Sequence, residues 1–298
     1  MSKIVMRKYK PGDETALKNM VKDENPAYAD NLAETLADAN RHKKLTVAEY
    51  DGVTAGYLWL SISPGNCQAF VFVSPEYRRR KIGTALCDEA SVLCREKNEK
   101  EMWAMYYDCE IGKGFADKVG CYYTTSSIYM EYTGALLPEH NKSANIRKCR
   151  AEDHLRCAYL WNKGFYELQI RIGHPDVKMR ETDENEENRQ NFADGLDNSY
   201  VAEENGQIVG YGVVSGNAIG ALAVDTEVNN RGYGTALTIF MTNEILKRGN
   251  ASACLWVESE NANARHIYEK TGYKKMETCY TSYKKIISGE IYGSDLRM

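Results

Sequence analysis

An internal repeat of about 150 residues constrains the fold of this chain more than any other feature. Residues 73–86 and 224–237 both begin with valine, carry an arginine at the same position and end in Gly-Thr-Ala-Leu, at an offset of 151. A second match, at an offset of 152, aligns residues 118–122 with 270–274. Solenoid repeats have periods of roughly 20–50 residues, whereas a unit of this length buries a core of its own. The repeat therefore predicts two tandem domains of one fold.

The two copies also match more loosely near their starts, where Arg7 and Asp13 align with Arg147 and Asp153. The boundary is expected in the polar segment 137–143, which contains a proline. A length of 298 residues suits two domains, since about 100–200 residues per domain is usual. The predicted domains are residues 1–138 and residues 144–298.

Each copy has the same expected order of elements: a strand, a helical region, a hairpin, a strand entering the repeated motif, a helix, a buried strand, a short helix and closing strands. The hairpin turns are placed at Asp51-Gly52 and Asn205-Gly206, because both central residues of such a turn need positive φ. This order predicts an α/β (mixed α+β) fold, in which each domain has a mixed, mostly antiparallel sheet flanked by helices.

Composition excludes several classes of function. With 38 basic and 42 acidic residues, the chain has no cationic excess for a nucleic acid or an anionic membrane. The longest low-charge stretch, 207–224, contains four glycines and is expected to form two strands and a turn rather than a membrane span. Nine scattered cysteines without CxxC, and five histidines without HExxH, favour reduced thiols in a cytoplasmic protein and no protein-bound metal.

The second copy of the motif has the composition of a phosphate-binding loop. Residues 229–235, Asn-Asn-Arg-Gly-Tyr-Gly-Thr, lie between an expected strand and an expected helix. Glycines allow a ligand close to the backbone, and the helix start adds free N–H donors, so the loop is suited to a pyrophosphate, with Arg231 as an added cation. The alternative is a tight strand-to-helix turn without a ligand. Downstream, Asn261 is expected to cap a helix on which Ala264 and Tyr268 share one face.

These motifs resemble those of the GCN5-related N-acetyltransferase (GNAT) family, and the resemblance covers both halves of the chain. The family's later pattern, Asn-x-x-Ala-x-x-x-Tyr-x-x-x-Gly-Phe, is matched in full from Asn261, with Tyr273 in place of the phenylalanine. Its glycine loop, Gln/Arg-x-x-Gly-x-Gly/Ala, is matched by Gly232 and Gly234, while Asn229 replaces the first residue. The tandem arrangement is also similar to that of mycothiol synthases, which does not identify the acceptor.

The resemblance implies an acetyl-CoA-dependent N-acetyltransferase that transfers acetyl directly to the amine of a small molecule, such as an amino sugar, a polyamine or an amino-acid derivative. Tyr268 is then the proton donor to the leaving thiolate; the alternative is an aromatic packed in the core. A backbone N–H near Val224 polarises the thioester carbonyl. The residues implied in binding acetyl-CoA are Leu222, Ala223, Val224, Asn229, Asn230, Arg231, Gly232, Tyr233, Gly234, Thr235, Asn261 and Ala264.

The general base is less well defined, because the strand before the loop has no glutamate. Glu258, at the end of the next expected strand, is the candidate, with Asp225 and Tyr283 as alternatives. The acceptor region is expected among the helices between residues 155 and 194, which include a possible loop at 174–176 and an acidic run at 183–187.

The first copy departs from the family pattern at the positions that carry chemistry. Lys81 replaces the first glycine, and alignment on the shared glycine places Ala116 at the tyrosine position and Cys109 at the asparagine position. The arginines 78–80 either attract phosphates or form a solvated turn. We therefore expect a degenerate first domain and a catalytic second one. The alternatives are a protein N-terminal or lysine acetyltransferase and a non-catalytic acyl-CoA-binding regulator.

Overall fold

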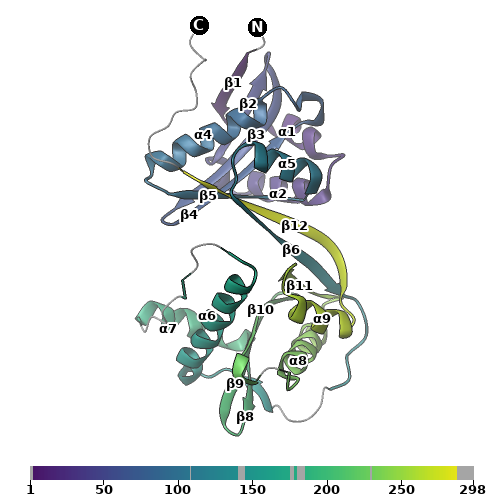
Figure 1. Ribbon diagram of the computed structural model, residues 1–298. Helices are drawn as coiled ribbons and strands as arrows, with labels where there is room; N and C mark the ends of the chain where they lie inside the picture. Colours follow the sequence, from purple (N-terminus) through teal and green to yellow (C-terminus); the bar gives the residue numbers. More distant parts are fainter. Residues whose placement is uncertain are drawn as a thin grey trace. The chain divides into compact units, whose positions relative to one another are not determined.

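The computed structural model describes residues 3–107, 109–139, 145–174, 178–179, 185–228 and 230–286. The chain forms two compact units. Unit 1 contains the described residues of 1–125 and 279–298, and unit 2 those of 126–278. Each unit is a mixed sheet flanked by helices, as the sequence predicted (Figure 1). Within the described residues, the helices are all too short or too polar to cross a membrane.

Unit 1 is built on a sheet in which β4 and β5 are parallel and the other printed strand pairs are antiparallel. In spatial order its strands are β1 (Ile4–Lys8), β2 (Leu45–Tyr50), β3 (Val53–Ser63), β4 (Asn66–Val73), β5 (Glu101–Tyr106) and the end of β12 (Lys274–Lys285). Its helices are α1 (Glu14–Val21), α2 (Pro26–Ala37), α3 (Ala39–His42), α4 (Ile82–Glu96) and α5 (Cys109–Lys118). Apolar residues of α1 and α2 pack on one face of the sheet and those of α4 on the other.

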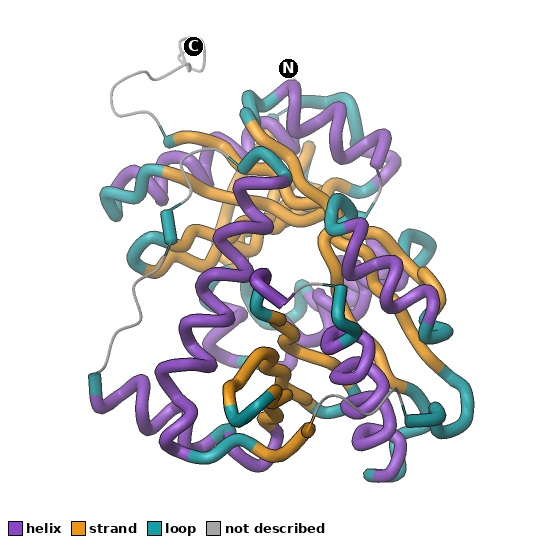
Figure 2. Tube along the Cα trace, turned by 60° about the horizontal axis from the view of Figure 1, so that its bottom comes forward, coloured by secondary structure: helices purple, strands orange, loops and turns teal. Residues whose placement is uncertain are grey.

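Unit 2 repeats this plan (Figure 2). Its strands are β7 (Asn145–Lys148), β8 (Ser199–Glu204), β9 (Gln207–Ser215), β10 (Ala218–Val224), β11 (Ala253–Glu258) and the end of β6 (Tyr123–Tyr132), with β10 and β11 parallel. Its helices are α6 (His154–Arg171), α7 (Glu186–Asp194), α8 (Tyr233–Lys247) and α9 (Ala262–Lys270). Helix α6 covers one face of β9 and β10, and α8 covers the other (Figure 1).

The last strand of each unit comes from the other half of the sequence. Residues Ser127 to Tyr132 of β6 pair with β11 in unit 2, and residues Tyr280 to Lys285 of β12 pair with β5 in unit 1. The compact units therefore differ from the predicted ranges 1–138 and 144–298. The difference arises because β5, in the first half of the sequence, pairs with β12 near the end of the chain, and β11, in the second half, pairs with β6.

The two predicted hairpin turns are confirmed. Asp51 and Gly52 have φ of 50° and 83°, and Asn205 and Gly206 have φ of 51° and 77°. Asparagine and aspartate tolerate this left-handed backbone because their short polar side chains bond locally, and glycine has no Cβ to clash. The turns set the register of β2 on β3 and of β8 on β9, which is the scaffold that leads into each repeated motif.

The duplication extends to a partly buried ion-pair cluster at the start of each unit. In unit 1, Arg7 bonds Asp13 and Glu49, each at 2.7 Å. In unit 2, Arg147 bonds Asp153 at 2.7 Å and also bonds Glu203. In both units the aspartate also accepts a backbone N–H from the residue three positions earlier. The same three charges thus tie the first strand to the following turn and to the second strand, and the arginine and the aspartate are the residues that the repeat aligned.

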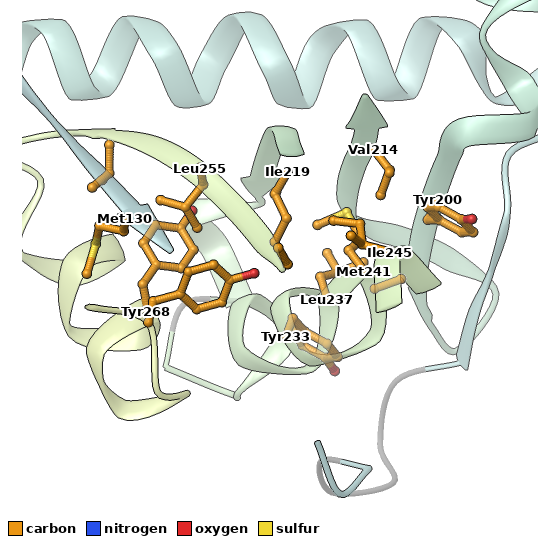
Figure 3. Close-up of a cluster of buried hydrophobic side chains, with 14 of the residues drawn as sticks. Met130, Tyr200, Val214, Ile219, Tyr233, Leu237, Met241, Ile245, Leu255 and Tyr268 are labelled. Carbon is orange, nitrogen blue, oxygen red and sulfur yellow. The ribbon is translucent and has the colours of Figure 1, made fainter. Parts of the chain in front are cut away.

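The core of unit 2 lies between α8 and the sheet. Figure 3 shows part of this cluster, in which Leu237, Met241 and Ile245 lie next to Val214. Helix α8 approaches the sheet closely because β9 carries a glycine at two contact positions. A Cβ at Gly210 would stand 2.7 Å from Leu237 Cδ1. This packing fixes the start of α8, which begins the candidate site.

Candidate active site

The central feature of unit 2 is a cavity of about 700 Å³ between two strands that separate. The parallel strands β10 and β11 pair only at Ala218 with Cys254 and at Ile219 with Leu255. Beyond that point β10 pairs only with β9 as far as Val224, and β11 only with β6 as far as Glu258. A register shift after Ile219 accompanies the separation. The opened strands leave backbone groups of β10 without a neighbour on the β11 side, as an extended ligand requires.

The loop that follows β10 forms one end of the cavity. Asn230 and Gly232 have φ of 65° and 87°, so the chain turns sharply before α8. Gly232 is the N-cap of α8 and provides no side-chain cap, so the first N–H groups of the helix remain for a ligand. Tyr233, Gly234 and Thr235 line the cavity at this point. Free N–H groups and the positive end of the helix dipole together favour an anion such as a phosphate.

Tyr268 lies on α9 and lines the same cavity. Its side chain is 7% exposed and its ring lies 5.9 Å from that of Tyr273. Burial raises the pKa of Tyr268 to about 12, because the phenolate would lose its hydration. The hydroxyl is therefore protonated across the physiological range and is able to donate a hydrogen bond into the cavity.

The candidate bases occupy very different environments. Glu258 ends β11, lines the cavity and accepts a hydrogen bond from Ser127 Oγ at 3.2 Å. Asp225 follows β10 and forms ion pairs with Arg156 and Lys163. Burial raises the pKa of Asp225, but the backbone N–H of residue 227 and the two cations outweigh burial and keep that pKa below its ordinary value. Asp225 is thus a structural anion, whereas Glu258 has access to the cavity.

The cavity collects nearly all of the residues predicted from the sequence. Asn261 caps α9 through Ala264 N, at 3.4 Å, and both residues line the cavity. The predicted residues that line it are Leu222, Ala223, Val224, Asn230, Gly232, Tyr233, Gly234, Thr235, Glu258, Asn261, Ala264 and Tyr268. Asn229 lies outside the described residues. Arg231 instead bonds Glu204 at 3.0 Å and is not part of the cavity wall as the described residues form it.

Other predicted positions fall elsewhere. Tyr283, an alternative base, belongs to the part of β12 that pairs with β5 in unit 1. Of the possible loop at 174–176, only His174 lies in the described residues, and it is not among those that line the cavity. Residues 183 and 184 of the acidic run also lie outside the described residues, and residues 185–187 are exposed.

Sequence reasoning identified the region of α6 but not its contributing residues. Several of its side chains line the cavity opposite the motif: Trp161, Phe165, Glu167, Leu168 and Arg171. Trp256 of β11 lines the cavity as well and is 49% exposed. The available sequence signal was weak: aromatics four positions apart on a helix are typical of any buried helix face.

Unit 1 has the same strand geometry with different contents. Strands β4 and β5 pair only at Gln68 with Trp103 and at Ala69 with Ala104, and the cavity there is about 280 Å³. Ala116 lines this cavity at the position equivalent to Tyr268, and the Cys109 side chain lies outside the described part of the structure.

The basic turn of unit 1 is largely engaged within the unit. Lys81 takes the left-handed φ of 65° that Gly232 takes in unit 2. Arg78 bonds Glu24 at 3.0 Å. The Arg80 guanidinium stacks over Tyr50, 5.1 Å from the ring centre.

Comparison with known proteins decides the family. Residues 14–112 match the model of the acetyltransferase (GNAT) family, and residues 212–282 match that of FR47-like proteins. This chain belongs to the GNAT family of N-acetyltransferases. Its cosubstrate is therefore acetyl-CoA, which the family uses as the acetyl donor.

Two curated relatives are named mycothiol acetyltransferase. The protein of Saccharomonospora viridis is 25% identical over 236 residues, which are 72% of this chain and 73% of the relative. That of Amycolatopsis mediterranei is 30% identical over 95 residues, which are 28% and 32% of the two chains.

The fold has close counterparts among solved structures. A GCN5-related N-acetyltransferase from Sphaerobacter thermophilus superposes with a TM-score of 0.67 at 17% identity, covering 96% of this chain and 97% of that one. A tandem GNAT protein from the clavulanic acid biosynthesis pathway superposes with a TM-score of 0.60 at 15% identity, covering 97% and 100%. Both support the tandem GNAT fold.

Proposed function

We propose that unit 2 is the catalytic unit of this N-acetyltransferase and that it transfers acetyl from acetyl-CoA to the amine of a small molecule. One observation supports this assignment above all. The separated strands β10 and β11, the turn before α8, and the side chains of Tyr268 and Glu258 border a single cavity of about 700 Å³. In unit 1 the equivalent cavity is about 280 Å³ and has no tyrosine at the position of Tyr268.

The end of the cavity near the turn before α8 has a backbone geometry that is suited to acetyl-CoA. Backbone groups of Leu222 to Val224 face an opening that is not filled by β11. The φ of 87° at Gly232 and the absence of a side chain there leave the first N–H groups of α8 accessible to a pyrophosphate. Arg231 is held by Glu204, so its contribution is a long-range attraction for the anion rather than a direct contact.

Two side chains are assigned roles in the transfer. The amine nitrogen forms a bond to the acetyl carbon while the bond from that carbon to the CoA sulfur breaks. Glu258 takes a proton from the ammonium, directly or through water, because an amine of pKa near about 10 is mostly protonated at neutral pH. The second proton, which the nitrogen loses as the amide forms, passes through water to the departing CoA sulfur, which leaves as the thiol. Tyr268 donates a hydrogen bond to the sulfur as it becomes a thiolate.

The relatives favour a small-molecule acceptor over a protein. Both curated relatives are named mycothiol acetyltransferase, and one structural neighbour is described as a glucosamine N-acetyltransferase region. For this chain we propose an amine borne on a small molecule, since a cavity of about 700 Å³ is within the usual range for small-molecule sites. We also propose a cytoplasmic location, because the nine cysteines are scattered along the sequence without a CxxC pair.

Calorimetric titration of the full chain with acetyl-CoA tests the assignment of the catalytic unit. We expect one site per chain, weakened at least about tenfold by Arg231→Glu, since the new carboxylate repels the pyrophosphate. Arg80→Glu is the matched control at the equivalent position of unit 1, and it should leave the affinity unchanged. Two sites per chain would contradict a degenerate unit 1, and the absence of any site would contradict the proposal as a whole.

A further inference from the structure

The two units allow a residue-by-residue comparison of the strand that borders the cavity. In unit 1, Val73 of β4 pairs with Gly56, and in unit 2, Val224 of β10 pairs with Gly210. The repeat aligns the two valines at an offset of 151. Phe72 is therefore the counterpart of Ala223, and by the same register Phe70 is the counterpart of Ala221. These positions face α1 and α2 in unit 1 and face α6 in unit 2.

In unit 1 the two phenylalanines fill the space on that face. Phe70 and Phe72 are each 4% exposed. Both stack on Tyr57, with ring centres 6.0 and 5.7 Å away, and both contact the edge of Tyr28 at 5.8 and 5.5 Å. The result is a packed aromatic cluster where a substrate would otherwise enter.

In unit 2 the same face is lined by small residues. Ala221 and Ala223 both border the cavity. Gly164 of α6 lies opposite, where an added Cβ would stand 3.5 Å from the Cβ of Ala223. At that distance α6 packs directly against Ala223, which is buried, whereas Ala221, two residues earlier on the same face, stays partly exposed to the cavity at the position that Phe70 occupies in unit 1.

The walls of this space are aromatic. Trp161 and Phe165 lie four residues apart on α6, with ring centres 4.1 Å apart. Phe165 is 43% exposed and Trp256 is 49% exposed, although both line the cavity. Large aromatics that stay half-exposed in a cavity offer their faces to a ligand, and a flat ring is the shape that stacks on them best.

A carboxylate lies on the same helix face. Glu167 lines the cavity, and its Oε1 accepts a hydrogen bond from Thr226 at 3.3 Å, next to the end of β10. The Thr226 hydroxyl helps to orient the Glu167 carboxylate near the end of β10, where the turn before α8 begins. A carboxylate beside aromatic faces is suited to the charged amine of a ring compound.

We propose that the α6 side of the cavity is the acceptor subsite, that it takes a primary amine carried on a ring, and that Ala221 and Glu167 determine this specificity. Ala221 provides the width for the ring, Trp161 and Phe165 stack on it, and Glu167 binds its ammonium group before the transfer. This inference rests on the proposed function of unit 2.

The test compares acceptors and variants of the full chain at saturating acetyl-CoA. Glucosamine and cyclohexylamine are the ring amines, and hexylamine and spermidine are the linear ones. We expect kcat/KM to be higher for the ring amines. Ala221→Phe, which copies Phe70 of unit 1, should lower kcat/KM for ring amines about 100-fold, since a displacement near 1 Å costs that much. Glu167→Gln should raise KM for the amine about tenfold with little change in kcat.

Matched controls separate these effects from folding. Glu187→Gln changes an exposed carboxylate of α7 and is the control for Glu167→Gln. Ile170→Ala removes an exposed apolar side chain of α6 that is outside the described cavity wall, and it controls for disturbance of that helix. Each variant is also titrated with acetyl-CoA, whose affinity should change less than twofold. Because two of the four tryptophans, Trp161 and Trp256, line the cavity, quenching of intrinsic fluorescence by a ring amine gives a readout without turnover.

The outcomes distinguish this inference from the proposal on which it rests. Active wild type with unchanged kinetics in Ala221→Phe and Glu167→Gln, or with a preference for the linear amines, would overturn the subsite alone. Acetyl-CoA binding without transfer to any amine of the panel would overturn the small-amine function, and the subsite with it.

Discussion

Replacing Tyr268 by phenylalanine should slow acetyl transfer without unfolding the protein. The ring of Tyr268 is 7% exposed and packs near Tyr273, so phenylalanine keeps the packing and removes only the hydroxyl that faces the cavity. The change in unfolding free energy should therefore stay within about 1 kcal/mol.

The raised pKa of Tyr268 sets the size of the expected effect. The pKa of this hydroxyl is about 12, whereas a free thiol has a pKa of about 8.5. Complete proton transfer to the thiolate would be uphill by about 3.5 units, or about 5 kcal/mol at 1.36 kcal/mol per unit. Tyr268 therefore acts mainly as a hydrogen-bond donor to the developing charge. The loss of one such donor typically costs about 10²–10³ in kcat.

Steady-state kinetics as a function of pH provides the assay. With wild type, kcat/KM should rise with pH as the acceptor amine loses its proton, without a decrease due to Tyr268 below about pH 10, because its hydroxyl stays protonated there. Tyr268→Phe should lower kcat at every pH and leave the acetyl-CoA affinity within about twofold of wild type. A decrease in rate near pH 9 that disappears in Tyr268→Phe would refute the raised pKa, and an unchanged kcat would refute the donor role.

Three further predictions concern stability and binding. Gly232→Ala should destabilise unit 2 by about 1–2 kcal/mol and weaken acetyl-CoA binding, since alanine is strained at a φ of 87°, as thermal melting and calorimetry would show. Lys81→Gly, at the equivalent φ of 65°, should instead stabilise unit 1 by about 0.5–1 kcal/mol; a lower melting temperature would contradict the comparison. Arg7 holds the pKa of Asp13 below its ordinary value, so their pairing stabilises unit 1 above about pH 4 and is lost as pH falls through the lowered pKa. Asp13→Asn should cost about 1–3 kcal/mol in urea unfolding at pH 7, since Arg7 keeps Glu49 as a partner, and should reduce the loss of stability at acid pH; an unchanged acid dependence would refute that account.

Much of the donor side of the site was predictable because its residues are local in sequence. The turn before α8 needs positive φ at fixed positions, and the helix that carries Tyr268 needs a cap and a small residue at fixed spacing. Such requirements leave a pattern within a dozen residues. The hairpin turns were predictable for the same reason.

The acceptor side was predicted only as a region, because it depends on contacts between distant segments. Whether Phe165 faces a cavity or a core depends on which strand α6 covers, and the sequence of α6 does not specify that strand. The sequence placed Arg231 beside the ligand, because nothing in it shows that this arginine pairs with Glu204 of β8. The pairing of β6 with β11 and of β12 with β5 leaves no local signal either, because two strands of similar alternating composition could each pair with β5 or with β11.

The duplicated architecture makes the proposed degeneracy of unit 1 interpretable as three separate changes in one framework. Lys81 places a side chain where Gly232 exposes backbone N–H groups, Ala116 lacks the hydroxyl that Tyr268 has, and Phe70 fills the space that Ala221 leaves open in unit 2. Each change affects a different part of the proposed reaction: the phosphate, the leaving sulfur or the acceptor. The ion-pair cluster of Arg7 is retained, because its role is to hold the first strand in place. Conserved scaffold contacts beside altered cavity positions are what we expect when a second copy is kept for its fold rather than its chemistry.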